Sequence, residues 1–83
     1  MSLVPRYFFN LFNDETTVDD EGQELAGLDA ARTRAIREAR VIACESVGKG
    51  HLNLADRIEV LDEAGALVLT VTFAEAVEVH ETR

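Results

Sequence analysis

The sequence predicts a two-layer α+β domain, in which one main helix covers one face of an antiparallel β-sheet. Near both ends of the chain, apolar residues alternate as they do in strands. Between residues 28 and 47 they recur every three or four positions, as they do in a helix. The predicted order is β-β-α-β-β, and the simplest packing of these elements lays the helix across one face of the sheet.

The first strand is predicted over residues 7–12, an aromatic run that follows Pro5. A turn at residues 13–14 leads into a short second strand at residues 16–18, because Asn and Asp side chains readily bond their own backbone. An acidic loop at residues 19–22 follows. We expect the acidic segment to be the solvated side of a hairpin.

The helix is predicted from Leu28 to about Val47. Its apolar stripe consists of Leu28, Ala31, Ala35, Ala39, Ile42 and Ala43. Because alanines dominate the stripe, we expect the helix backbone to approach the sheet closely. Gly48 and Gly50 are expected to end the helix through a left-handed C-terminal cap.

A second hairpin is predicted from strands at residues 57–61 and 66–73, joined by a turn that contains Gly65. The residues after it form either a helical turn at 74–77 or a further strand through Val79. The side chains expected under the helix are Tyr7, Phe9, Leu11, Ile58, Val60, Leu67, Leu69, Val71 and Phe73. We divide the chain into a leader or flexible N-terminus at residues 1–4, a single domain at 5–77 and a tail at 78–83.

The reverse face of the sheet is predicted to carry an apolar patch of Phe8, Phe12, Leu61 and Val68. A monomer seldom exposes such a patch, so either the tail or a second subunit is expected to cover it. The chain has 83 residues, and a core of that size yields a small net stability. We therefore expect self-association as a homodimer through this candidate interface or through an edge strand, and an unidentified protein partner as a second case.

Composition excludes several classes of function. Sixteen acidic and eight basic residues give a net charge of −8, which disfavours binding to nucleic acid and to anionic membranes. No apolar run approaches the length of a membrane span, and no signal peptide is evident, so we expect a cytoplasmic protein. The one cysteine, Cys44, has no partner for an intramolecular disulfide.

Several stretches together resemble a known family. They are Pro5–Phe9 (PRYFF), Asp20–Leu25 (DEGQEL), an Ala-rich helix, Asp62–Gly65 (DEAG) and Leu69–Phe73 (LTVTF). The chain is similar to a domain-of-unknown-function family of short bacterial proteins. The resemblance implies this fold and no activity or cofactor. In that family a His commonly follows the aromatic pair, where this chain has Asn10.

The acidic segment fails the one metal template that it approaches. If Gly22 takes the sixth position of a calcium-binding loop, Thr17 takes the first and Leu28 the twelfth, where Asp and Glu are needed. Cys44, His51 and His80 lack the paired spacing of a zinc site and form no evident catalytic dyad. We expect a packed Cys44, no metal, no cofactor and no enzymatic activity.

One basic cluster lies on the helix. Arg34, Arg37 and Arg40 follow each other at three-residue steps and share one side, so they form a candidate anion-binding strip. They can equally pair with nearby acids. The function that we expect is a non-catalytic protein-interaction or regulatory module that acts as a homo-oligomer. The alternative is a protein that binds a small ligand, an anion or a divalent metal.

Overall fold

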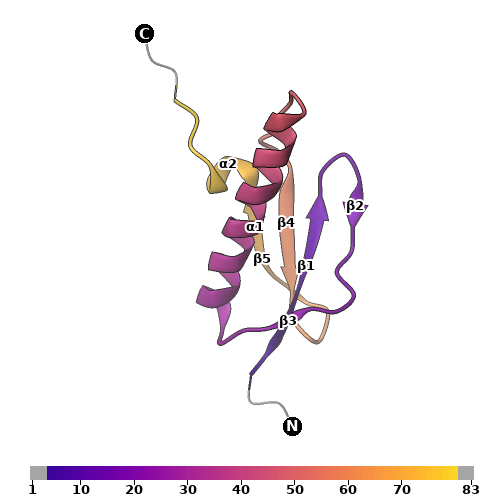
Figure 1. Cartoon of the computed structure of the whole chain (residues 1–83). Coiled ribbons are helices and arrows are strands. Elements are labelled where there is room, and N and C mark those ends of the chain that lie inside the picture. Colours follow the sequence, from indigo (N-terminus) through magenta and orange to yellow (C-terminus); the bar gives the residue numbers. More distant parts are fainter. Residues whose placement is uncertain (1–3, 81–83) are drawn as a thin grey trace.

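The computed structural model describes residues 4–80. Residues 1–3 of the expected leader and residues 81–83 of the expected tail lie outside this described part. The elements are β1 (Arg6–Phe12), β2 (Thr16–Thr17), β3 (Gln23–Glu24), α1 (Leu28–Gly48), β4 (Arg57–Leu61), β5 (Leu67–Thr72) and α2 (Phe73–Ala76). Figure 1 shows α1 lying across one face of the sheet, with α2 beside it. The predicted α+β class is confirmed.

The sheet has five antiparallel strands, and its main order is β2-β1-β4-β5. The long pairing in the middle joins β1 to β4, from Phe8 opposite Leu61 to Phe12 opposite Arg57. The other edge of β1 is shared, because β3 pairs with its first two residues and β2 with its last two. Strand β3 was not predicted, since two residues carry no readable alternation.

Alanines bring α1 against the sheet, as predicted. Ala31, Ala35 and Ala39 have no exposed surface, and Ala43 has 4%. A side chain of one carbon allows the helix backbone to approach β4 and β5, whose Ile58, Val60 and Val71 are also buried. Leu28 is an exception to the predicted stripe. It is 49% exposed because it is the first helical residue and lies at the rim of the core.

Gly50 ends α1 in the predicted way. Its φ of +95° is in the left-handed region, where Gly lacks the penalty that other residues incur. The backbone N–H of Gly50 donates to the carbonyl of Val47, and that of His51 donates to the carbonyl of Ser46. These two bonds form a Schellman motif around the C-cap residue Lys49.

A register shift at the start of β5 overturns two predictions. Val60 faces Leu69 and Leu61 faces Leu67, so Val68 is an extra residue on β5. Such a bulge interrupts the alternation of side chains. Val68, predicted on the reverse face, packs against the core, and Leu67, predicted under the helix, is 55% exposed.

The segment after β5 forms the helical turn α2 and not a further strand. Thr72 caps it, because its hydroxyl accepts from the backbone N–H of Glu75 while the Glu75 carboxylate accepts from the N–H of Thr72. The hydrogen bonds that the Glu75 carboxylate accepts from the backbone N–H and the hydroxyl of Thr72 lower the pKa of Glu75. Phe73, expected to end the strand, instead begins α2 and is fully buried. Within the described residues, no helix has the length and apolar character to cross a membrane.

Candidate functional site

The reverse face of the sheet is partly covered by the chain's own residues. Phe8 lies beneath Gly22, where a Cβ atom would be 2.8 Å from the Phe8 ring and 2.9 Å from the carbonyl oxygen of Tyr7. Gly22 has a φ of +71°, so both its conformation and this close approach require Gly. The loop before β3 therefore covers part of the ring that the sequence predicted to be bare.

Phe12 is covered by a cation. The guanidinium carbon of Arg57 lies 4.4 Å from the centre of the Phe12 ring, within the range of a cation–π contact. Arg57 also donates to the carboxylate of Glu59 at 2.8 Å. Because Phe8 and Phe12 both have intrachain neighbours, the reverse face is a weaker candidate interface than the sequence predicted. Leu61 lies on this face opposite Phe8, whereas Val68 has left it.

The β1 edge of the sheet is closed along its length. Between β3 and β2, the carboxylate of Asp19 accepts from the backbone N–H of Phe9 at 3.0 Å, and the side chain of Asn10 accepts from the N–H of Asp19 at 2.9 Å. The same carboxylate accepts from the N–H groups of Glu21 and Gly22. Burial acts to raise the pKa of Asp19, but these backbone hydrogen bonds together lower it.

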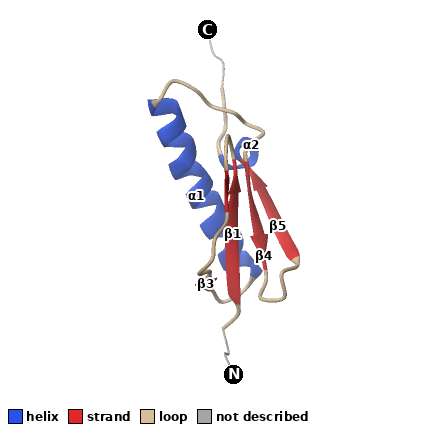
Figure 2. Cartoon of the chain, turned by 90° about the vertical axis from the view of Figure 1, so that its right-hand side faces the viewer, coloured by secondary structure: helices blue, strands red, loops and turns tan. Residues whose placement is uncertain are grey.

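The β5 edge is open. β5 pairs with β4 on one side, and no described strand pairs with its other side. Figure 2 shows β5 as the outermost strand, with no segment of the chain alongside it. The six residues Leu67–Thr72 include no charge and no proline, and Leu67 and Thr70 are exposed.

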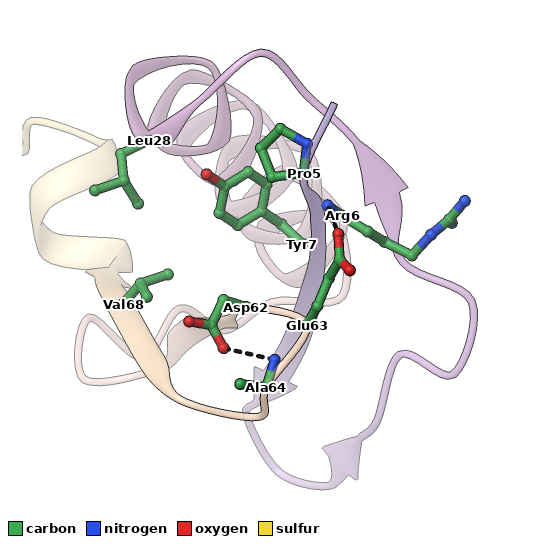
Figure 3. Close-up of a pocket in the computed structure, with 8 residues that line it drawn as sticks. All are labelled: Pro5, Arg6, Tyr7, Leu28, Asp62, Glu63, Ala64 and Val68. Carbon is green, nitrogen blue, oxygen red and sulfur yellow. Dashed lines mark hydrogen bonds between the residues drawn. The ribbon is translucent and has the colours of Figure 1, made fainter. Parts of the chain in front are cut away.

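A hollow of about 450 Å³ lies beside the start of β5 (Figure 3). Its apolar walls are Pro5, Tyr7, Leu28 and Val68. Its two carboxylates are already engaged with backbone. Asp62 accepts from the N–H groups of Ala64 and Ala66, and Glu63 accepts from the N–H of Arg6. The side chain of Arg6 points away from the hollow (Figure 3). Asp62 therefore holds the hairpin turn, and Glu63 attaches that turn to β1.

The predicted arginine strip separates into two parts. The guanidinium of Arg40 donates to the carbonyl of Ala76 at 2.7 Å and so attaches α2 to α1. Arg34 and Arg37 instead line a hollow of about 290 Å³ together with Leu25, Ala30 and Thr33. Two of the three predicted residues, Arg34 and Arg37, therefore line one site, whereas Arg40 has a structural role.

A polar hollow of about 250 Å³ lies at the C-terminal end of α1, where Asp14, Glu45 and His51 gather. Asp56 lies close to this hollow and is buried. Burial and, secondly, the charge of Asp14 raise the pKa of Asp56, while His51 acts to lower it. Within residues 4–80, the structure has no group of three or more His, Cys, Asp or Glu side chains arranged to hold a metal ion.

Cys44 is exposed and not packed, which corrects the sequence prediction. It lines a shallow apolar hollow with Val47 and Val79. His80 pairs with the neighbouring Glu78 at the surface, far along the chain from the other predicted chemistry. Glu78, the partner of His80, also lines the Cys44 hollow, whereas His51 lines the polar hollow at the end of α1.

Sequence reasoning missed two features of these surfaces. The acidic loop was interpreted as solvated, whereas Asp19 in it organises the β1 edge. The open edge of β5 was not singled out, although the sequence has an uncharged run of eleven residues between Glu63 and Glu75. That signal indicates a strand without the charges that usually protect an exposed edge.

A family model, DUF6894, described as a domain of unknown function, matches residues 6–74. No curated protein and no solved structure matches the chain.

Proposed function

We propose that this chain, which belongs to the DUF6894 family of domains of unknown function, is a non-catalytic interaction module that joins a second copy of itself through β5. The observation that carries this proposal is the contrast between the two edges of the sheet: one side ends in the two-residue strands β2 and β3, and the other in the six-residue strand β5. The β1 edge is closed by β2, β3 and the Asp19 carboxylate. The β5 edge has no partner strand among the described residues.

An open edge presents unpaired backbone N–H and C=O groups to any extended strand nearby. Proteins usually protect such edges with charges, proline, bulges or a covering segment. In β5 the bulge lies at Val68, and Leu69–Thr72 keep a regular register with β4. This regular stretch carries no charge, so the edge is suited to pairing with a strand from outside.

A second copy fits this edge because it brings an equally long, uncharged strand. Antiparallel pairing of two β5 strands requires a two-fold axis perpendicular to the sheet, which keeps both α1 helices on the same face. Residues directly opposite each other in an antiparallel pair point to the same face. The axis must therefore pass through a residue pair. Within the regular stretch Leu69–Thr72 we place it at Thr70 and its symmetry mate, because Thr70 is exposed.

Pairing through β5 would also raise the stability of a chain whose hydrophobic core is small. The largest fully buried side chains of the described residues are Phe73, Ile58, Val60 and Val71. Burial of apolar surface contributes about 25 cal/mol per Å², so a second sheet alongside adds stability that the single chain lacks.

The variant Thr70→Lys tests the proposal. It places two like charges directly opposite each other across the axis, which destabilises strand pairing. We expect the parent chain to be a dimer in sedimentation velocity at about 100 μM, a concentration at which an interface worth about 5.5 kcal/mol is substantially occupied. Thr70→Lys is expected to be a monomer under the same conditions.

Thr17→Lys is the matched control, since Thr17 is also exposed and lies on the closed edge, in β2. It makes the same change of charge and is expected to leave the dimer intact. A monomeric parent chain contradicts the proposal, as does a dimer that Thr70→Lys does not weaken. Phe8→Ser distinguishes the reverse face, because it leaves an edge dimer intact and disrupts a dimer built on that face.

A further inference from the structure

We propose that the hollow bounded by Arg34, Arg37 and Thr33 binds a carboxylate or phosphate group carried by a small molecule. This site lies on the outer surface of α1, on the helix and not on the β5 edge. It is independent of self-association and gives the protein a second binding function.

The three polar residues share one side of α1. Arg34 and Arg37 are three positions apart, and Thr33 and Arg37 are four apart, so their side chains are neighbours on the helix surface. Leu25, in the segment that joins β3 to α1, and Ala30 complete the wall. A backbone hydrogen bond from Leu25 to the carbonyl of Pro5 holds that segment in place at 3.0 Å. The hollow is therefore formed by two separate parts of the chain.

The guanidinium groups of Arg34 and Arg37 do not stabilise the fold through hydrogen bonds or ion pairs among residues 4–80. Three other arginines have structural roles: Arg6 bonds the carbonyl of Glu21, Arg40 that of Ala76, and Arg57 the Glu59 carboxylate. Arg32 also has no hydrogen bond or ion pair within residues 4–80, but it does not line the hollow. Arg34 and Arg37 have no hydrogen bond or ion pair within residues 4–80. This is notable in a chain with sixteen acidic residues.

Glu38 is the acidic residue best spaced to pair with Arg34, but it bonds a different residue. Glu38 follows Arg34 by four positions, the spacing at which opposite charges on a helix pair. The carboxylate of Glu38 instead accepts a hydrogen bond from the side-chain amide of Gln23 in β3, at 3.3 Å. Glu38 forms no ion pair with Arg34 among residues 4–80, so the guanidinium is available to a ligand.

Oxyanions fit this arrangement. A guanidinium presents parallel N–H donors that match two oxygens of a carboxylate or phosphate, and a hydroxyl adds a further donor. Leu25 and Ala30 offer an apolar surface beside the charged pair, so a short alkyl group on the ligand gains contact there. The net charge of −8 repels free anions, so binding depends on these direct contacts.

Titration of the full chain with inorganic phosphate, acetate and hexanoate tests the site, with amide NMR shifts as the readout and ionic strength held constant with sodium chloride. We expect saturable shifts at residues 25–37 below roughly 20 mM, the range that fills a millimolar site. Arg37→Gln and Arg34→Gln are each expected to weaken binding about tenfold. Hexanoate is expected to bind more tightly than acetate.

Arg32→Gln is the matched control, because Arg32 is an exposed arginine of the same helix that does not line the hollow. It removes the same charge and is expected to change the affinity less than about twofold. Phosphate binding without carboxylate binding identifies a phosphate ligand, and the reverse identifies a carboxylate. The proposal is overturned if none of the three probes saturates, or if Arg32→Gln weakens binding as much as Arg37→Gln.

Discussion

At the scale of single residues, Asp19 has the largest structural role of any acidic side chain in the described residues. Its carboxylate accepts backbone N–H groups from Phe9, Glu21 and Gly22, and its own N–H is held by Asn10. These bonds connect β1 to the loop that covers it. They also bond the part of β1 that lies between its pairings with β3 and β2, where no strand lies alongside it.

We predict that Asp19→Ala destabilises the fold by about 2 kcal/mol, because three backbone donors lose a charged acceptor and only the exposed ones regain water. Urea unfolding at neutral pH measures the change. Asp20→Ala is the control, since Asp20 is an exposed neighbour whose removal leaves these bonds intact. An equal loss in both variants would show that the effect comes from loop charge and not from the hydrogen bonds.

The same contact has a defined pH dependence. The pKa of Asp19 in the folded state lies below its ordinary value of 3.8, so folding favours the ionised carboxylate. The stabilisation is therefore fully present above about pH 4 and is lost as the pH falls through the folded-state pKa. The difference between the parent chain and Asp19→Ala should shrink over that range.

The sequence does not reveal this role of Asp19. Several acids lie within the same loop, and composition alone treats them as equivalent. The course of the loop in three dimensions determines which of these carboxylates reaches the backbone of β1. The positions of the acids in the sequence do not show this. For the same reason, the coverage of Phe8 by Gly22 became visible only in three dimensions.

At the scale of elements, α1 was predicted well because a repeated local pattern defines it. Alanines at four-residue steps predicted both the buried face and the close packing on the sheet. Gly50 marked the end of the helix, because a left-handed cap strongly favours that residue. Strand β5 was predicted less well, since its bulge arises from pairing with β4 and not from its own sequence.

We predict that Ala35→Leu destabilises the protein by about 1–3 kcal/mol, because Ala35 has no exposed surface and added carbons must push the helix off the sheet. Ala30→Leu, in the same helix at a half-buried position, is expected to cost much less. Thermal or urea unfolding of both variants measures the difference. Equal stability of the two variants would contradict close packing at Ala35.

At the scale of the whole molecule, two asymmetries matter. One side of the sheet ends in two-residue strands and the other in the six-residue strand β5, and the net charge is −8 although Arg34 and Arg37 lie together on α1. The proposed contact between copies uses an uncharged strand. The proposed ligand site uses Arg34 and Arg37, two of the arginines within residues 4–80 that form no hydrogen bond or ion pair. The two proposals therefore respond to salt in opposite directions.

We predict that self-association strengthens as sodium chloride is raised from low concentration to about 0.15 M, because salt screens the repulsion between two copies that each carry a net charge of −8. Sedimentation equilibrium at several salt concentrations measures this. Binding of phosphate or hexanoate to the arginine site should weaken over the same range. Association that weakens with salt would indicate an interface built on ion pairs, which β5 does not offer.

The sequence by itself determined the α+β class, the helix with its alanine stripe and the two hairpins, because these depend on periodicity and turn residues within short stretches. The tertiary structure decided which side of the sheet Val68 occupies, what covers Phe8 and Phe12, and which edge is open. It also decided which arginines the fold uses. These outcomes depend on register and on contacts between segments far apart in the chain, which no local pattern specifies.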